Sequence, residues 1–124
     1  MNLTGDARET VSSSDDFQYV VSPGNFGNLP AAAFRFRGNG SVPVDAPGTG
    51  ARVRSLRTAN GYTMEVAIPW TDMSIQPREG LTIGAALSIN DNDSPGTAVQ
   101  ELMLSHVSTR RWNNPTTWGQ MTLE

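Results

Sequence analysis

The sequence predicts an all-β fold, an antiparallel β-sandwich of the jelly-roll type with about seven strands and no substantial helix. Twelve glycines and eight prolines among 124 residues favour frequent turns over long helices. Between the turn-rich stretches lie short runs in which apolar and polar residues alternate, the pattern of a strand with one buried face. The length fits one domain with one modest core.

The predicted strands follow one another at short spacing. The polar residues 1–16 are expected to form a flexible N-terminal segment, and the sandwich domain is expected to span residues 17–124. The seven strands are predicted at residues 17–22, 32–37, 51–58, 62–68, 81–90, 98–105 and 118–123. Residues 38–50 are expected to be loop, because they are too rich in glycine and proline for regular structure.

The connections between strands carry local signals of their own. Asn60-Gly61 lies between two alternating runs and predicts a tight hairpin turn, because both residues tolerate a positive φ. Residues 70–75 are expected to form a single helical turn, capped by Thr71 or Asp72. The polar stretch from Asn90 to Gly96 predicts another turn.

Two strands carry the clearest alternation and should supply much of the core. The run after the hairpin is expected to place one set of side chains on its inner face: Tyr62, Met64, Val66 and Ile68. The run 81–90 is expected to do the same with a second set: Leu81, Ile83, Ala85, Leu87 and Ile89. Together these residues define the predicted interior of the sandwich.

Charge and composition exclude several classes of function. The net charge is −3 and all nine basic residues are arginine, a balance that argues against sequence-independent nucleic-acid binding. The chain has no cysteine, which excludes disulfides, zinc–thiolate sites and a cysteine nucleophile. No apolar run is long enough for membrane insertion, and residues 1–16 contain no leader, so an exported form is expected to have a leader that this chain lacks.

The second half of the chain resembles the family 9 carbohydrate-binding modules. Three stretches carry the resemblance, in the family's order: GYTMEVAIPW from Gly61, GLTIGAALSINDND from Gly80, and WNNPTTWGQMTL from Trp112. Residues 15–18 (DDFQ) are similar to an early strand of the family, more loosely. The family's domains are longer on the N-terminal side, so the resemblance implies strands that are either absent from this chain or supplied by another.

The resemblance implies a non-catalytic carbohydrate-binding domain whose binding residue is Trp112. This tryptophan lies in a polar loop, where its ring can pack on the C–H face of a sugar. Its polar neighbours are expected to pair with sugar hydroxyls: Arg110, Arg111, Asn113 and Asn114. The alternative is that Trp112 folds back over the sandwich end. Trp70 and Trp118 are expected in the core, with a second stacking platform as the alternative.

The loop after residue 90 has two interpretations. Asp91 and Asp93 offer hard oxygen ligands at alternate positions, which suits Ca²⁺, and the family resemblance implies that a structural calcium ion can be present. An Asx-rich turn that closes a hairpin explains the same residues without a metal. Haem is not expected, because Met103 and His106 would lie on opposite faces of a strand.

Enzymatic activity is not expected. His106 is the single histidine, and no serine-nucleophile motif accompanies it. A glycosidase needs two carboxylates that flank a cleft, and only Glu65 and Glu101 stand on predicted strands in outward positions. The expected function is binding of short saccharides or polysaccharide chain ends by a secreted or cell-surface module. The alternative is an assembly subunit, a homo-oligomer or a sandwich completed by a partner's strands.

Overall fold

The computed structural model describes residues 10–91, 94 and 102–124, and the fold is all-β as predicted. Within these residues, nine strands and two short 3₁₀ turns make up the regular structure. The strands are β1 (Phe17–Ser22), β2 (Ala32–Arg37), β3 (Val44–Asp45), β4 (Arg52–Thr58), β5 (Gly61–Ala67), β6 (Thr82–Ala85), β7 (Ser88–Asp91), β8 (Leu102–Ser105) and β9 (Gly119–Thr122). The helical turns are η1 (Trp70–Met73) and η2 (Pro115–Thr117). Neither turn, nor any other helix among the described residues, is long enough to cross a membrane.

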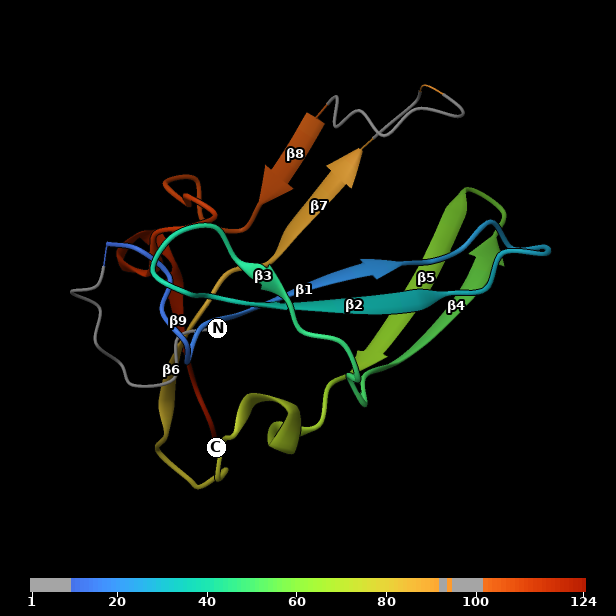
Figure 1. Ribbon diagram of the computed structural model, residues 1–124. Coiled ribbons are helices and arrows are strands. Elements are labelled where there is room, and N and C mark those ends of the chain that lie inside the picture. Colours follow the sequence, from blue (N-terminus) through green and yellow to red (C-terminus); the bar gives the residue numbers. More distant parts are fainter. Residues whose placement is uncertain (1–9, 92–93, 95–101) are drawn as a thin grey trace.

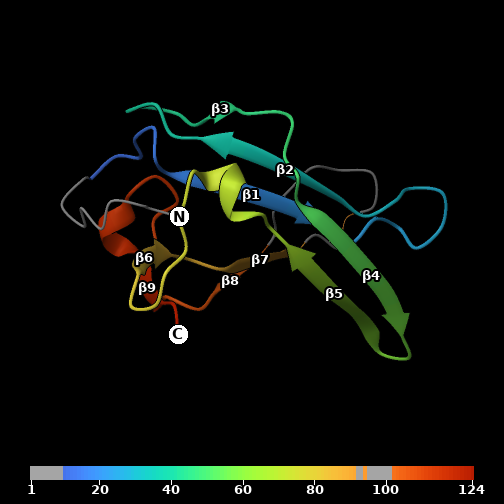
Figure 2. The ribbon, with the colours of Figure 1, turned by 90° about the horizontal axis from the view of Figure 1, so that it is seen from below.

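All strand pairs among the described residues are antiparallel, and the strands form four small sheets. β1, β2 and β3 form one sheet, and the pairs β4–β5, β6–β9 and β7–β8 form the others. Figure 1 shows β4–β5 crossing one end of β2, while Figure 2 shows the same hairpin extending away from β1 and β2, with β6, β9, β7 and β8 as a second layer under β1. The arrangement is that of a β-sandwich whose layers spread apart at one end.

The core is small and lies where the two layers approach each other. Its buried apolar residues come from β1, from β6 and from the segment around η1: Phe17, Met73, Ile75 and Ile83. Four half-buried residues pack against them: Tyr19, Ile68, Trp70 and Leu81. Trp70 therefore covers the core, as the sequence predicts.

The strand count differs from the prediction for two local reasons. The predicted loop 38–50 contains the two-residue strand β3, which pairs with β2 through Phe36 and Asp45. The predicted strand 81–90 is divided into β6 and β7, because the chain changes partner: β6 pairs with β9 as far as Ala85, and β7 pairs with β8 from Ser88. The predicted strand 98–105 is described only from Leu102 onward.

Several side chains predicted to face the core are exposed. On β5, Tyr62 and Val66 are exposed, and beyond the break at Leu87 both Leu87 and Ile89 are exposed as well. Both β4–β5 and β7–β8 are two-stranded ribbons among the described residues. Ile83 alone of the apolar residues predicted inward on these two runs is completely buried.

Two turn predictions need correction in detail. The hairpin between β4 and β5 is present, but Thr58 pairs with Gly61, so the turn residues are Ala59 and Asn60 rather than Asn60 and Gly61. The helical turn η1 is present, but its N-cap is Pro69 and no side chain caps it. Asp72 is instead used in a contact with a distant loop.

Candidate functional site

The candidate binding surface is a hollow between the N-terminal part of the chain and the C-terminal loop. It is lined by residues from both ends of the sequence: Ser12, Asp16, Phe17, Gln18, Gly38, Pro43, Trp112 and Trp118. Trp112 is 48% exposed, so it does not fold back into the interior. The hollow is too small to enclose a sugar ring, and a ligand at this position would lie across its mouth.

A polar network joins the two ends of the chain at this hollow. The Ser12 hydroxyl donates to Asn113 Oδ1 at 2.8 Å, and the Ser12 amide donates to the Asn113 carbonyl at 3.2 Å, across a sequence separation of 101 residues. The Asp16 carboxylate accepts from the Ser13 amide at 2.8 Å. Ser12 and Asp16 are almost fully buried.

Gly38 lets the backbone close around this network. The Gly38 amide donates to the Asp16 carbonyl at 2.9 Å. A Cβ at this position would lie 2.2 Å from the Ser13 carbonyl oxygen, far inside van der Waals contact. The close approach of the two backbone segments therefore requires glycine.

Trp118 forms part of the wall beside Trp112. It is half-buried, and its indole Nε1 donates to the Arg111 carbonyl at 2.9 Å. The same loop is tied by a bond from the Arg111 amide to Thr117 Oγ1 at 2.7 Å. Trp118 is thus neither wholly in the core nor an open platform; it holds the loop that presents Trp112.

The other predicted site residues have mainly local partners. Asn114 caps η2, because its Oδ1 accepts from the Thr116 amide at 3.1 Å. Arg110 directs its guanidinium to Met103 Sδ. Arg111 is exposed. Asn113 is bonded to Ser12, which lines the hollow; since its Oδ1 accepts from Ser12, its side-chain amide nitrogen is the group left to donate to a ligand.

The site also contains residues of the N-terminal half that the sequence did not predict. Gln18, on β1, lines the hollow with a half-buried amide side chain. Pro43 adds an apolar edge. The one sequence signal is the loose family likeness of residues 15–18, which gives no indication that they contact the Trp112 loop.

The calcium hypothesis stays a prediction. Asp91 is exposed at the end of β7, and Asp93 lies outside the described residues. Within the part of the chain that the structure describes, no three His, Cys, Asp or Glu side chains converge as metal ligands would.

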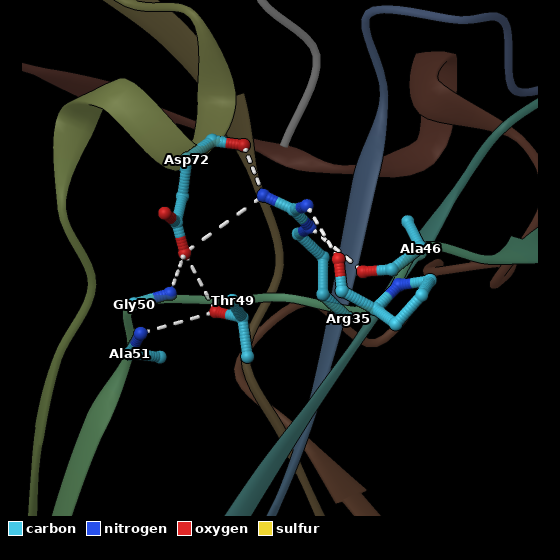
Figure 3. A network of polar contacts seen from close by, with 7 residues as sticks. Arg35, Ala46, Thr49, Gly50, Ala51 and Asp72 are labelled. Carbon is cyan, nitrogen blue, oxygen red and sulfur yellow. Dashed lines mark hydrogen bonds and ion pairs between the residues drawn. The ribbon is translucent and has the colours of Figure 1, made fainter.

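A polar network around Arg35, away from the hollow, has a structural role. Arg35 on β2 donates to three backbone carbonyls, those of Ala46, Pro47 and Asp72, and its guanidinium lies 3.9 Å from the Asp72 carboxylate (Figure 3). The same carboxylate oxygen accepts from Thr49 Oγ1 at 2.6 Å and from the Gly50 amide at 2.8 Å. The network fixes two segments, the loop before β4 and the turn η1, to the sheet formed by β1, β2 and β3.

This network predicts acid sensitivity. The hydrogen bond from the Thr49 hydroxyl lowers the pKa of Asp72 below its ordinary value of 3.8. The hydrogen bond from the Gly50 amide and the positive charge of Arg35 act in the same direction. A lowered folded-state pKa stabilises the fold at all pH values above the ordinary one, and this stabilisation is lost as the pH falls through the folded-state value. The free energy of unfolding of the wild type should therefore approach that of Asp72→Asn below about pH 4 in denaturant titrations. The prediction would be contradicted if the wild type stayed more stable than Asp72→Asn by the same amount from pH 7 to pH 2. Asp45→Asn, on the exposed strand β3, is the control variant.

Comparison with known proteins gives a consistent result. Residues 5–124 match the family model described as "Carbohydrate family 9 binding domain-like". The chain is also similar to endo-1,4-beta-xylanase A of Thermoanaerobacterium saccharolyticum, at 29% identity over 116 residues. That alignment covers 94% of this chain but only 9% of the xylanase. No solved structure gives a significant match.

Proposed function

Because the chain belongs to the carbohydrate family 9 binding domain-like proteins, we propose that it is a non-catalytic module that binds short saccharides or polysaccharide chain ends at Trp112. The observation that carries the proposal is the half-exposed indole of Trp112 at the mouth of the hollow. Pyranose rings have C–H faces that pack on aromatic rings, and an exposed indole held by a fixed loop offers such a platform at low entropic cost.

Polar groups around the indole suit the hydroxyls of a sugar. Gln18 offers both a donor and an acceptor, and Asn113 offers its amide nitrogen. The bond between Ser12 and Asn113 fixes the orientation of the Asn113 amide before a ligand arrives. A few fixed polar groups beside an aromatic surface are typical of small-molecule sites.

The arrangement of carboxylates supports binding without catalysis. Glycoside hydrolysis needs two carboxylates on either side of the scissile bond. Among the described residues, Asp16 is the one carboxylate that lines the hollow, and it is buried with its side chain bonded to the Ser13 amide. Glu65 lies on β5, in the β4–β5 ribbon at the end of the molecule opposite η2, and Glu101 lies outside the described residues.

The biological setting that we propose is extracellular glycan degradation. The similarity to a small part of a protein named as a xylanase supports a role beside a glycan-degrading enzyme, on a secreted protein or at a bacterial cell surface. The module would then keep the attached enzyme close to its substrate, which raises the local concentration of polysaccharide.

The proposal is tested by affinity electrophoresis in gels that contain xylan or hydroxyethylcellulose. Wild-type protein should be retarded, and Trp112→Ala should lose at least about tenfold in affinity, since truncation of a central aromatic anchor commonly costs more than about 1.4 kcal/mol. Leu104→Ala, which truncates an exposed apolar side chain on β8, is the matched control and should migrate like the wild type. Equal retardation of Trp112→Ala and the wild type would remove Trp112 from the binding role.

One observation favours an assembly role as the second candidate. The ribbon β7–β8 exposes a set of large apolar side chains: Leu87, Ile89, Leu102 and Leu104. Among the described strands, β8 pairs with β7 alone, so its other edge is open for a further strand. Sedimentation velocity distinguishes the two functions: stable oligomers that dissociate on Leu104→Glu would support assembly, and a monomer at high concentration would exclude it.

A further inference from the structure

A second aromatic cluster lies at the other end of the molecule from the hollow. Residues 23–31 connect β1 to β2 and lie beside the β4–β5 hairpin, whereas the C-terminal turn η2 lies at the opposite end in both views (Figures 1 and 2). Phe26 in this connection and Tyr62 at the start of β5 have ring centroids 5.7 Å apart and an interplanar angle of 46°. The Arg57 guanidinium lies 5.2 Å from the centre of the Phe26 ring.

Hydrogen bonds hold the connection in a fixed conformation against the hairpin. Asn25 Oδ1 accepts from the backbone amides of Gly27 and Leu29 at 3.0 and 2.9 Å, and the backbone amide of Asn25 donates to the Leu29 carbonyl. Gly24 has a φ of +72°, and a Cβ there would lie 2.3 Å from the Leu29 carbonyl oxygen. The Ser55 hydroxyl donates to the Pro23 carbonyl at 2.7 Å, which fixes the base of the connection to β4.

Phe26 is held in a backbone conformation that a bulky residue rarely adopts. Its φ is +59°, in the left-handed region. Burial of the ring would offset the cost of this conformation, yet Phe26 stays 37% exposed and Tyr62 49% exposed. A strained backbone position that carries a partly exposed aromatic ring points to a use for that surface.

We infer that Phe26, Tyr62 and Arg57 form a second carbohydrate-contact surface, separate from the hollow at Trp112. The tilted ring of Tyr62 offers a face for a pyranose, and its hydroxyl adds a polar group to the ring. Arg57 supplies donors beside the Phe26 ring, and Asn28, whose Oδ1 accepts from Asn25, has its side-chain amide nitrogen as a further donor in the same connection. Aromatic rings bordered by amides and a guanidinium suit a polar ligand with apolar faces, and that combination is a saccharide.

Two contact surfaces at opposite ends would let one module hold a polysaccharide at two points. Binding of the second point is then governed by effective concentration, so a long chain would be retained more strongly than the fragments that fit either surface alone. The inference goes beyond the proposed function, since the second surface can bind or fail to bind independently of Trp112.

The test is a titration of ¹⁵N-labelled protein with xylohexaose and, separately, cellohexaose, followed by amide chemical shifts. The amides of Gly27, Arg57 and Tyr62 should shift saturably, and Tyr62→Ala should weaken this response about tenfold while the shifts near Trp112 persist. Tyr62→Phe keeps the ring and should retain most of the response. Leu56→Ala truncates an exposed side chain on the same hairpin and should change nothing.

The outcomes separate the two proposals. Shifts confined to the Trp112 region would overturn the second surface and leave the first intact. Shifts confined to the Phe26–Tyr62 region would support the second surface and contradict the role of Trp112. An unchanged response in a folded Tyr62→Ala variant would overturn the second surface, and no response in either region to either hexasaccharide would overturn both.

Discussion

Replacement of Ile83 by alanine is expected to lower the free energy of unfolding by about 3–4 kcal/mol. Ile83 has no exposed surface and packs in a core that contains, among the described residues, only three other buried apolar side chains, so the lost contacts have few substitutes. A domain of this size has a total stability of about 5–15 kcal/mol, so the change removes a large share of it. Guanidinium chloride titration followed by tryptophan fluorescence measures the effect.

Ile89→Ala is the matched control for this prediction. Ile89 lies in the same predicted strand as Ile83, six residues further on, but its side chain is 57% exposed on β7. Its truncation should cost less than about 1 kcal/mol. Equal losses in the two variants would show that the ribbon β7–β8 is buried in solution, either in a different packing or against another chain.

Gly38→Ala is expected to be the most damaging single-atom change near the site, with a loss of roughly 2–3 kcal/mol of stability. The added Cβ would meet the Ser13 carbonyl oxygen at 2.2 Å and the Ser12 carbonyl carbon at 2.7 Å. Both contacts are with backbone, so no side-chain rotation relieves them. The shift of residues 12–13 should also disturb the bond from Ser12 to Asn113 and weaken saccharide binding.

Gly27→Ala provides the comparison. A Cβ on Gly27 would be 3.5 Å from Asn25 Oδ1, an ordinary contact. Thermal unfolding should place this variant within a degree or two of the wild type, against a decrease of about 8 °C or more for Gly38→Ala. A Gly38→Ala variant with wild-type thermal stability would mean that residues 12–13 do not approach Gly38 closely in solution.

Local sequence patterns are sufficient to predict the strands whose partners are near in sequence. The bounds of β1 and β2 are those predicted, because a turn-rich segment flanks each apolar run and the two strands pair directly through it. The hairpin of β4 and β5 is also predicted, with an error of one residue in its turn. In each case the information needed lies within a few residues.

Patterns fail where a distant contact decides the structure. The alternation of residues 81–90 continues past Leu87, but β6 pairs with β9 as far as Ala85 and β7 pairs with β8 from Ser88, so the run is divided between two sheets. No local signal in residues 81–90 indicates this. The exposure of Leu87 and Ile89 likewise depends on what packs over the ribbon, which alternation alone does not specify.

The candidate site is predictable in part for the same reason. The neighbours of Trp112 in the sequence indicate an exposed tryptophan in a polar loop, and Trp112 is exposed as expected. Gln18 lines the same hollow as Trp112, and a hydrogen bond joins Ser12 to Asn113. Both contacts join segments about a hundred residues apart, which no local pattern indicates. Asn114, predicted at the site for its hydrogen-bonding capacity, uses that capacity to cap η2.

The most direct measurement follows the indole N–H signals of the three tryptophans during a saccharide titration. If a sugar lies on the ring at the mouth of the hollow, the Trp112 signal should move most, Trp118 should move less because its Nε1 is bonded to the Arg111 carbonyl, and Trp70, packed on the core, should stay in place. Saturable binding that leaves the Trp112 signal unmoved would contradict the account.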